Sequence, residues 1–179
     1  MSAPAILTIG HSTHELEEFL GLLRDSGVEL LTDVRRFPGS RRVPWTNAES
    51  LERSLAEAEI GYRHFEELGG RRRDGKQSRN DGWRVAGFRA YADYMESPEF
   101  EAALDELQAE ARQRLTAVMC AEAQWWRCHR RLVSDALTVR GWQVLHVDAR
   151  GERSEHPLTE FAVVEGHRIR YPAQLTLDG

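Results

Sequence analysis

Residues 5–34, AILTIGHSTHELEEFLGLLRDSGVELLTDV, decide the fold of this chain. The stretch opens with a short apolar run, residues 5–9, which is typical of a buried strand. A helix follows, with leucines recurring on one face and with Ser12 or Thr13 expected to cap its start. A second apolar run over residues 28–34 indicates another buried strand. A strand, a helix and a strand in so short a stretch predict parallel strands joined by a right-handed crossover.

The alternation of strands and helices continues through most of the chain. Further helices are expected over about residues 47–59, 87–95, 97–113 and 124–139, and further strands over residues 60–65, 115–120 and 142–147. Residues 69–84 form a glycine-rich basic loop, and residues 168–177 are a candidate for a late strand or hairpin. This order predicts a single α/β domain over residues 1–179, with a mostly parallel sheet flanked by helices in a Rossmann-like, three-layer arrangement.

The composition is that of a globular protein of ordinary size. The 179 residues are 41% hydrophobic and 30% charged. No apolar run reaches the length of about eighteen residues that indicates a membrane-spanning helix. The N-terminus has neither the basic flank nor the long apolar run of a signal peptide. Two cysteines in a chain that is not expected to be secreted are typical of reduced thiols rather than a disulfide.

The charge of the chain is unevenly distributed. Residues 35–89 carry 13 basic and 8 acidic side chains, a local +5, whereas the rest of the chain carries 11 basic and 21 acidic side chains, a local −10. This segregation indicates an anion site, for phosphate or nucleic acid. The alternative is compositional, because 23 of the 24 basic residues are arginine and arginine is simply the usual base of this chain.

Polar side chains collect where the predicted strands end. In an open parallel sheet the binding crevice lies at the carboxyl ends of the strands. The residues at and after these ends include several histidines, a cysteine and the lone acids: His11 and Ser12, then Asp33, Arg35 and Arg36, then His64 and Glu66, then Cys120 and Glu122, and finally His146 and Asp148. We therefore expect a functional site at this edge of the sheet.

The first two strand ends offer acid, base and anion-binding groups. Asp33 is a candidate general base, metal ligand or orienter of Arg35, or else a cap or loop salt-bridge partner. Arg35, with Arg36 beside it, is suited to holding a phosphate or carboxylate, or else Arg35 pairs with Asp33 itself. His11 and Ser12 occupy a strand-to-helix turn, where backbone N–H groups point at anions, and the alternative is simple capping by Ser12.

The stretch 117–130, AVMCAEAQWWRCHR, holds both cysteines of the chain. Cys120 and Glu122 are two residues apart at a strand end, so their side chains are expected on one side. Cys128 and His129 are expected in the first turns of the next helix, whose positive end lowers the pKa of a thiol. This pattern suits a nucleophilic or redox thiol. It also suits a zinc or iron site built from Cys120, Glu122 and Cys128, although the spacing is no standard zinc motif. A structural role for Cys128 on the apolar face is the third alternative.

Two tryptophans stand next to arginines in the same stretch. Trp125 and Trp126 neighbour Arg127, and Arg130 and Arg131 follow directly. Aromatic rings interleaved with arginine stack on nucleic-acid bases in many proteins. The alternative is that the tryptophans form a helix face packed on the core, and both interpretations are open from the sequence.

Four short motifs occur in an order that resembles a known family. They are Thr8 to Ser12, then Asp33 to Arg35 with Pro38 and Ser40, then Gly61-Tyr62 with Leu68 to Gly70, and finally Met119 to Glu122 with Cys128 to Arg130. This order resembles the family of domains of unknown function called DUF488, over about residues 6–147, while residues 149–179 stay unplaced. The resemblance implies a compact α/β domain from cytoplasmic bacterial and archaeal proteins, with the four motifs meeting at one site. It carries no established reaction.

The sequence favours an enzyme acting on a phosphate-bearing substrate, a nucleotide or nucleic acid. In this hypothesis Asp33 or Glu122 is the acid or base, His11 and His129 assist, and Cys120 or Cys128 is the nucleophile or redox group. The anionic group is expected to bind to basic and polar residues: His11, Ser12, Arg35, Arg36 and Arg130. One alternative is a nucleic-acid-binding module without catalysis. Another is a metal-binding protein that holds zinc or iron with Cys120, Glu122 and Cys128.

Overall fold

The computed structural model describes residues 2–73 and 77–174 and is built around a six-stranded sheet. The strands have the order β3-β2-β4-β1-β5-β6. The first five of these are mutually parallel, and the sixth pairs antiparallel with β5. Their bounds are β1 (Ala5–Gly10), β2 (Leu30–Asp33), β3 (Gly61–His64), β4 (Thr116–Cys120), β5 (Gln143–Val147) and β6 (Arg153–Glu155). The predicted α/β fold with a mostly parallel sheet is confirmed.

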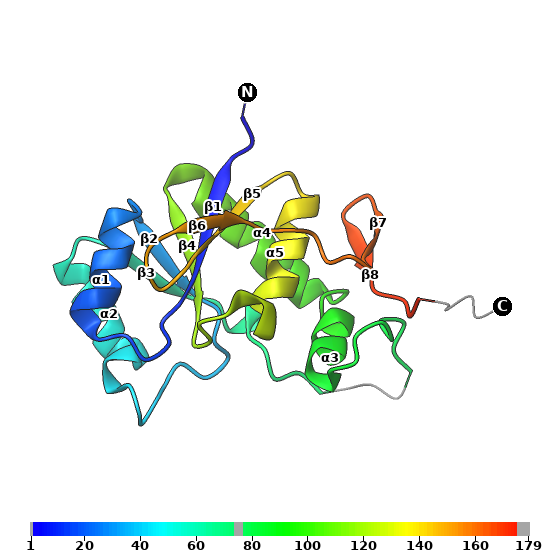
Figure 1. Cartoon of the computed structure of the whole chain (residues 1–179), viewed down its shortest axis with the longest axis horizontal. Helices are drawn as coiled ribbons and strands as arrows, with labels where there is room; N and C mark the ends of the chain where they lie inside the picture. The colour runs from blue at the N-terminus through cyan, green and yellow to red at the C-terminus, as the bar shows by residue number, and fades with distance from the viewer. Residues whose placement is uncertain (1, 74–76, 175–179) are drawn as a thin grey trace.

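Helices cover both faces of the sheet (Figure 1). On one face lie α1 (Leu16–Asp25) and α2 (Ala48–Glu57), and on the other lie α3 (Ala86–Tyr94), α4 (Pro98–Gln113) and α5 (Arg130–Val139). The side chains of β1 explain this sandwich, because successive residues of a strand point to opposite faces. Leu7 and Ile9 pack in the core beneath α1 and α2, whereas Ile6 packs in the core beneath the other three helices.

The strand order places a crevice at the centre of the sheet. Strand β4 lies between β1 and β2, so the chain moves outward from β1 to β3 and then returns through β4 to β5. In parallel sheets a ligand site is expected where the chain reverses its direction of winding, outside the carboxyl ends of the strands. In this protein that position is the shared edge of β1, β2 and β4.

The start of α1 differs from its prediction. The helix begins at Leu16 with Glu15 as its N-cap residue, so Ser12 and Thr13 do not cap it. Ser12 has a positive φ of 47°, and its amide donates to the carbonyl of Ala121 at 3.0 Å. The chain after β1 thus continues its main-chain pairing with the segment after β4 before it turns into the helix.

The start of α5 also differs from its prediction. A short 3₁₀ turn, η3 (Trp125–Arg127), precedes an extended Cys128, and α5 begins only at Arg130. The expectation that Cys128 and His129 lie within the first turns of this helix is therefore wrong. The physical reason is the extended backbone of Cys128 (φ −133°, ψ 157°), which interrupts the helix and in which the Cys128 sulfur contacts that of Cys120.

The tail folds back on the domain. Strands β7 (Val163–Glu165) and β8 (Arg168–Arg170) form a hairpin, which agrees with the expected late strand; residues 175–177 of that prediction lie outside the described residues. Tyr171 is buried and packs on Trp83 and Phe161.

Two further 3₁₀ turns are η1 (Pro44–Thr46) and η2 (Glu66–Leu68). No helix in residues 2–73 and 77–174 has both the length and the apolar character needed to cross a bilayer.

Candidate functional site

A pocket of about 460 Å³ opens at the carboxyl edge of β1, β2 and β4. Its walls come from the segments that follow these strands, from the loop after η2 and from the residues before α5. The lining residues are His11, Arg35, Arg36, Phe37, Gly39, Ser40, Gly70, Arg71, Cys120, Ala121, Glu122, Arg127, Cys128 and His129. A larger hollow of about 910 Å³ lies between the β7–β8 hairpin and the helices α3 to α5, but no cysteine lines it and it is remote from the strand ends.

Two thiols meet in the wall of the pocket. The sulfur atoms of Cys120 and Cys128 lie 2.8 Å apart, and the two residues are 2% and 8% exposed. Cys120 is the last residue of β4, whereas Cys128 is an extended residue between η3 and α5. The two sulfurs therefore form a buried, hydrogen-bonded pair with access to the pocket.

The surroundings shift the pKa values of the two thiols in opposite directions. Burial by itself raises the pKa of Cys128, but the hydrogen bond with Cys120 and the nearby Arg130 guanidinium outweigh burial and lower the pKa to about 7. Burial, together with the neighbouring Cys128 sulfur, raises the pKa of Cys120 well above its ordinary value. Cys128 is therefore the group that carries the thiolate, and Cys120 stays a thiol beside it.

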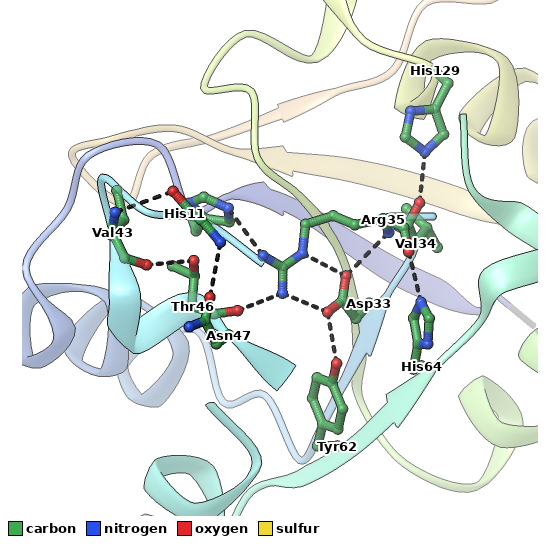
Figure 2. Close-up of polar contacts among 11 residues, drawn as sticks. His11, Asp33, Val34, Arg35, Val43, Thr46, Asn47, Tyr62, His64 and His129 are labelled. Carbon is green, nitrogen blue, oxygen red and sulfur yellow. Dashed lines mark hydrogen bonds and ion pairs between the residues drawn. The ribbon is translucent and has the colours of Figure 1, made fainter. Parts of the chain in front are cut away.

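His129 presents an acceptor to this thiol pair. Its Nε2 lies 2.8 Å from the carbonyl oxygen of Val34 (Figure 2). Because a carbonyl only accepts, Nε2 carries the proton and Nδ1 has the lone pair. This Nδ1 lies 3.5 Å from the Cys128 sulfur. Burial lowers the pKa of His129, so the imidazole is neutral at neutral pH.

Arg130 is a buried cation without a carboxylate partner among the described residues. It is 1% exposed. Its Nη2 donates to the carbonyls of Glu122 and Ala123, its Nη1 donates to the hydroxyl of Thr8 at 3.3 Å, and its Nε has no hydrogen-bond partner. A buried charge needs compensation. The adjacent Cys128 thiolate supplies it, because the guanidinium is one of the groups that lower the pKa of that thiol.

The Arg35 fork is occupied by Asp33 (Figure 2). Nε and Nη2 of Arg35 bind the two carboxylate oxygens at 2.9 and 2.7 Å, and Nη2 also donates to the carbonyl of Thr46. The hydroxyl of Tyr62 donates to the same carboxylate at 2.7 Å, and burial and this carboxylate raise the pKa of the phenol. Of the two alternatives left by the sequence, the salt bridge is the one formed. Asp33 is fully buried and does not line the pocket.

His11 and Ser12 line the same edge, but their amides are not free for an anion. These two N–H groups donate to the carbonyls of Cys120 and Ala121 at 2.9 and 3.0 Å. The Nδ1 of His11 lies 2.9 Å from the Ser12 carbonyl, so Nε2 has the lone pair and faces Nη1 of Arg35 at 3.5 Å. Burial lowers the pKa of His11.

The Glu122 side chain does not lie where the sequence predicts it. Its side chain is exposed rather than placed beside the Cys120 thiol, because the chain bends after β4. The atom that approaches the Cys120 sulfur, at 3.7 Å, is the Glu122 carbonyl oxygen. Within the described ranges no group of three or more histidine, cysteine, aspartate or glutamate side chains is arranged to hold a metal ion. The proposed ligand set of Cys120, Glu122 and Cys128 thus does not fit zinc or iron.

Cations form the outer rim of the pocket. Arg36, Arg71 and Arg127 line it, and the side chains of Arg71 and Arg127 make no hydrogen bond or ion pair within the part of the chain that is described. Nη1 of Arg36 donates to the carbonyl of Arg71 at 2.8 Å, which ties the two rim loops together. Arg71 and Arg127 were not among the individual site residues predicted from the sequence, although their segments were expected to bind an anion or to stack on bases.

Glycine makes the close approach of these loops possible. A Cβ on Gly69 would lie 2.6 Å from the Cα of Arg36, and a Cβ on Gly70 would lie 3.0 Å from Nδ1 of His129. Only residues without a side chain let the loop after η2 close against both segments. The Gly69-Gly70 pair thus has a physical reason in the shape of the pocket.

The family model for the Domain of unknown function DUF488 matches residues 15–137. The match includes the segments that supply Asp33, Arg35, the Gly69-Gly70 pair and both cysteines, and it covers more than half of the chain. No curated protein and no solved structure matches the chain. The chain therefore belongs to the DUF488 family, whose function is unknown.

Proposed function

We propose that this protein is a thiol-dependent enzyme that acts on a phosphate-bearing substrate, a nucleotide or nucleic acid, at the carboxyl edge of the sheet. The observation that carries the proposal is the position of Cys128. Its thiolate, stabilised by Cys120 and Arg130, opens on a pocket whose rim carries three arginines. A stabilised thiolate supplies a nucleophile, and the rim cations attract a phosphate to it.

The proposed reaction is a two-step transfer of the phosphoryl group through Cys128. The Cys128 thiolate attacks phosphorus, a sulfur–phosphorus bond forms, and the bond from phosphorus to the leaving oxygen breaks. In this proposal Glu122, which is exposed and lines the pocket, protonates the leaving oxygen and then takes a proton from the attacking water. That water cleaves the sulfur–phosphorus bond, which restores the thiolate and releases the phosphoryl group. Asp33 and Arg35 hold the pocket wall in this proposal and do not touch the substrate.

Exposed aromatic rings beside the rim arginines favour a nucleotide or nucleic acid. Phe37 is 61% exposed and Trp126 is 47% exposed, and each directly follows or precedes a rim residue, Arg36 or Arg127. Bases stack on such rings in sequence-tolerant fashion. Trp125, in contrast, stacks on the buried His146 at a centroid distance of 4.3 Å, so the two neighbouring tryptophans have different environments.

Dithiol–disulfide exchange is a second candidate function. The 2.8 Å contact of the two sulfurs favours it, because a disulfide that Cys128 forms with a substrate is then within reach of Cys120. A nucleic-acid-binding module without catalysis is the weaker alternative, since it leaves the stabilised thiolate without a role.

The test is hydrolysis of phosphate esters. We expect the protein to release phosphate from nucleoside monophosphates or to cleave a single-stranded oligonucleotide, and the Cys128→Ser variant to lose this activity. Mass spectrometry of an acid-quenched reaction is expected to find the phosphoryl group on Cys128. The Arg127→Ala variant is expected to raise KM, whereas Arg150→Ala, at an exposed arginine outside the pocket, is the matched control. Activity that survives Cys128→Ser contradicts the proposal.

A further inference from the structure

A chain of buried polar side chains leads from Arg130 into the core. The Thr8 hydroxyl lies 2.6 Å from Nδ1 of His146, and Nε2 of His146 lies 2.9 Å from Nδ1 of His156. Nε2 of His156 lies 2.7 Å from a carboxylate oxygen of Asp135. All four residues that extend the chain from Arg130 are buried. They come from β1, β5, the tail and α5, so the fold alone brings them together.

The carboxylate end sets the direction of every hydrogen bond in this chain. Asp135 also accepts from the Thr159 amide at 3.1 Å and from the Tyr171 hydroxyl at 2.8 Å, so it acts only as an acceptor. With a neutral ring, His156 then carries its proton on Nε2 and accepts on Nδ1. The protons in the rest of the chain follow from this assignment.

The hydrogen bonds between His156 and Arg130 follow from the same proton assignment. His146 donates from Nε2 to His156 and accepts on Nδ1, so the Thr8 hydroxyl donates to His146. The hydroxyl oxygen of Thr8 then has its lone pairs free to accept from Nη1 of Arg130. Thr8, His146 and His156 each donate toward Asp135 and accept from the Arg130 side, so no two donors or two acceptors face each other.

His146 cannot reverse this direction at neutral pH. Burial, followed by the neighbouring His156 and Arg130, lowers the pKa of His146 to about 2. Trp125 covers one face of its ring, with the planes 6° apart. A neutral imidazole in a fixed tautomer keeps the Thr8 hydroxyl turned inward and its lone pairs turned toward the guanidinium.

We propose that Thr8, His146 and His156 are positioning residues, which connect Asp135 to Arg130 and thereby hold the guanidinium beside the Cys128 sulfur. This inference rests on the proposed role of Cys128 as the nucleophile. Arg130 has no carboxylate partner of its own among the described residues and leaves Nε unpaired, so neutral acceptors hold its charge at the thiolate: two carbonyls on Nη2 and the Thr8 hydroxyl on Nη1. The chain of Thr8, His146 and His156 supplies the Nη1 side of this frame and connects it to the distant charge of Asp135.

Other groups that face the thiol do not depend on this chain. Besides Arg130, the titratable and charged groups around Cys128 are Cys120 from β4, His129 from its own loop, Tyr91 from α3 and, across the pocket, His11, Arg35 and the rim arginines with Glu122. The Thr8→Val variant changes none of them and changes no charge. It removes one hydroxyl from a buried site at nearly constant volume, so it isolates the link between Arg130 and His146.

The test measures the titration of Cys128 in the resting protein. The rate of alkylation by iodoacetamide is followed against pH, with mass spectrometry of the peptide that contains Cys128. In Thr8→Val the Arg130 Nη1 loses its acceptor, while Nη2 keeps the carbonyls of Glu122 and Ala123, so the guanidinium is held beside the sulfur on one side only. We expect the midpoint to rise by about one pH unit, which is a roughly ten-fold smaller thiolate fraction below the midpoint. Thr8→Ser, which retains the hydroxyl, is expected to keep the wild-type midpoint.

The outcomes separate this inference from the proposed function. A folded Thr8→Val protein with an unchanged or lower midpoint overturns the positioning role. If Thr8→Val does not fold, as judged by near-ultraviolet circular dichroism, His156→Leu removes both hydrogen bonds of the same chain one step further on and must raise the midpoint instead; an unchanged midpoint there overturns the inference equally. A wild-type midpoint at the ordinary value of a free thiol removes the basis of the proposed nucleophile itself.

Discussion

The sulfur of Cys128 lies 2.8 Å from the sulfur of Cys120, yet the two thiols differ in acidity. Cys120 is the last residue of β4 and lies deeper, whereas Cys128 faces the Arg130 guanidinium at the start of α5. One member of the pair is thereby a thiolate near neutral pH while the other stays a thiol. Such a division lets one sulfur act as a nucleophile and the other as a proton donor or resolving thiol.

Selective alkylation tests this division directly. The pKa of Cys128 is lowered to about 7, so its thiolate fraction grows as the pH rises from 6 to 8. The pKa of Cys120 is raised, so that thiol stays protonated over the same interval. We expect iodoacetamide to label Cys128 with a midpoint near pH 7 and to label Cys120 slowly. Equal labelling of both cysteines, measured by peptide mass spectrometry, would contradict the assignment.

Mild oxidation is expected to join the two thiols. With one equivalent of hydrogen peroxide, the Cys128 thiolate is oxidised to a sulfenic acid, and Cys120 then displaces water to form the disulfide. Two thiols lose two electrons and two protons, and the peroxide is reduced to two waters. The expected product is a monomer with no free thiol that regains both thiols with dithiothreitol. In Cys120→Ser the sulfenic acid is expected to persist, and a disulfide-linked dimer in the wild type would contradict the prediction.

Replacement of Arg35 is expected to destabilise the fold. Arg35 binds both oxygens of Asp33, which is fully buried, so Arg35→Ala leaves a buried carboxylate without its cation. Breaking a buried pair in this way typically costs about 3–5 kcal/mol. Urea unfolding measures the loss, and Arg36→Ala, at the next and partly exposed residue, is the control, with an expected change within about 0.5 kcal/mol. A stable Arg35→Ala protein that only loses ligand binding would restore the anion-binding role suggested by the sequence.

Local patterns in the sequence are sufficient for the framework of the fold. The strands β1, β2 and β4 are covered by helices on both faces, so they appear as short, mainly apolar runs, and the helices between them have one apolar face. The edge where functional groups collect also follows from the parallel order, because every parallel strand delivers its next residues to the same side. His11, Arg35, Cys120 and His129 all reach the pocket as expected.

Local sequence patterns do not predict the contacts between segments that are distant along the chain. The approach of Cys128 to Cys120 depends on the interruption between η3 and α5, and no local pattern distinguishes that interruption from a continuous helix. The salt bridge of Arg35 was one of two open alternatives, and the partners that complete it, Tyr62 and Thr46, come from other segments. His156 belongs to a tail whose composition gives no sign that it reaches the core.

Two glycine-to-alanine variants are expected to act in opposite directions. A Cβ on Gly10 would lie 1.9 Å from the Glu122 carbonyl oxygen, so Gly10→Ala must displace the loop that Arg130 binds, at a cost of about 1–3 kcal/mol. Gly21 lies inside α1, and a Cβ there would meet no atom within 4 Å beyond the backbone of its own helix. Gly21→Ala is therefore expected to stabilise the protein by about 0.5–1 kcal/mol. Thermal unfolding compares the two, and a neutral Gly10→Ala would mean that this loop is free to move.

Acid should destabilise the protein through His146. Burial, with His156 and Arg130 nearby, lowers its pKa in the folded state to about 2 from 6.5. As the pH falls below 6.5 the unfolded chain takes up a proton that the folded chain does not, so stability is lost on that side. Between pH 7.5 and 5.5 this contributes about 1.4 kcal/mol. The difference in unfolding free energy between the two pH values, from urea titrations, is therefore expected to shrink by that amount in His146→Gln. It is expected to stay unchanged in His167→Gln, at an exposed position. An equal difference in wild type and His146→Gln would show that His146 takes up its proton in the folded protein too.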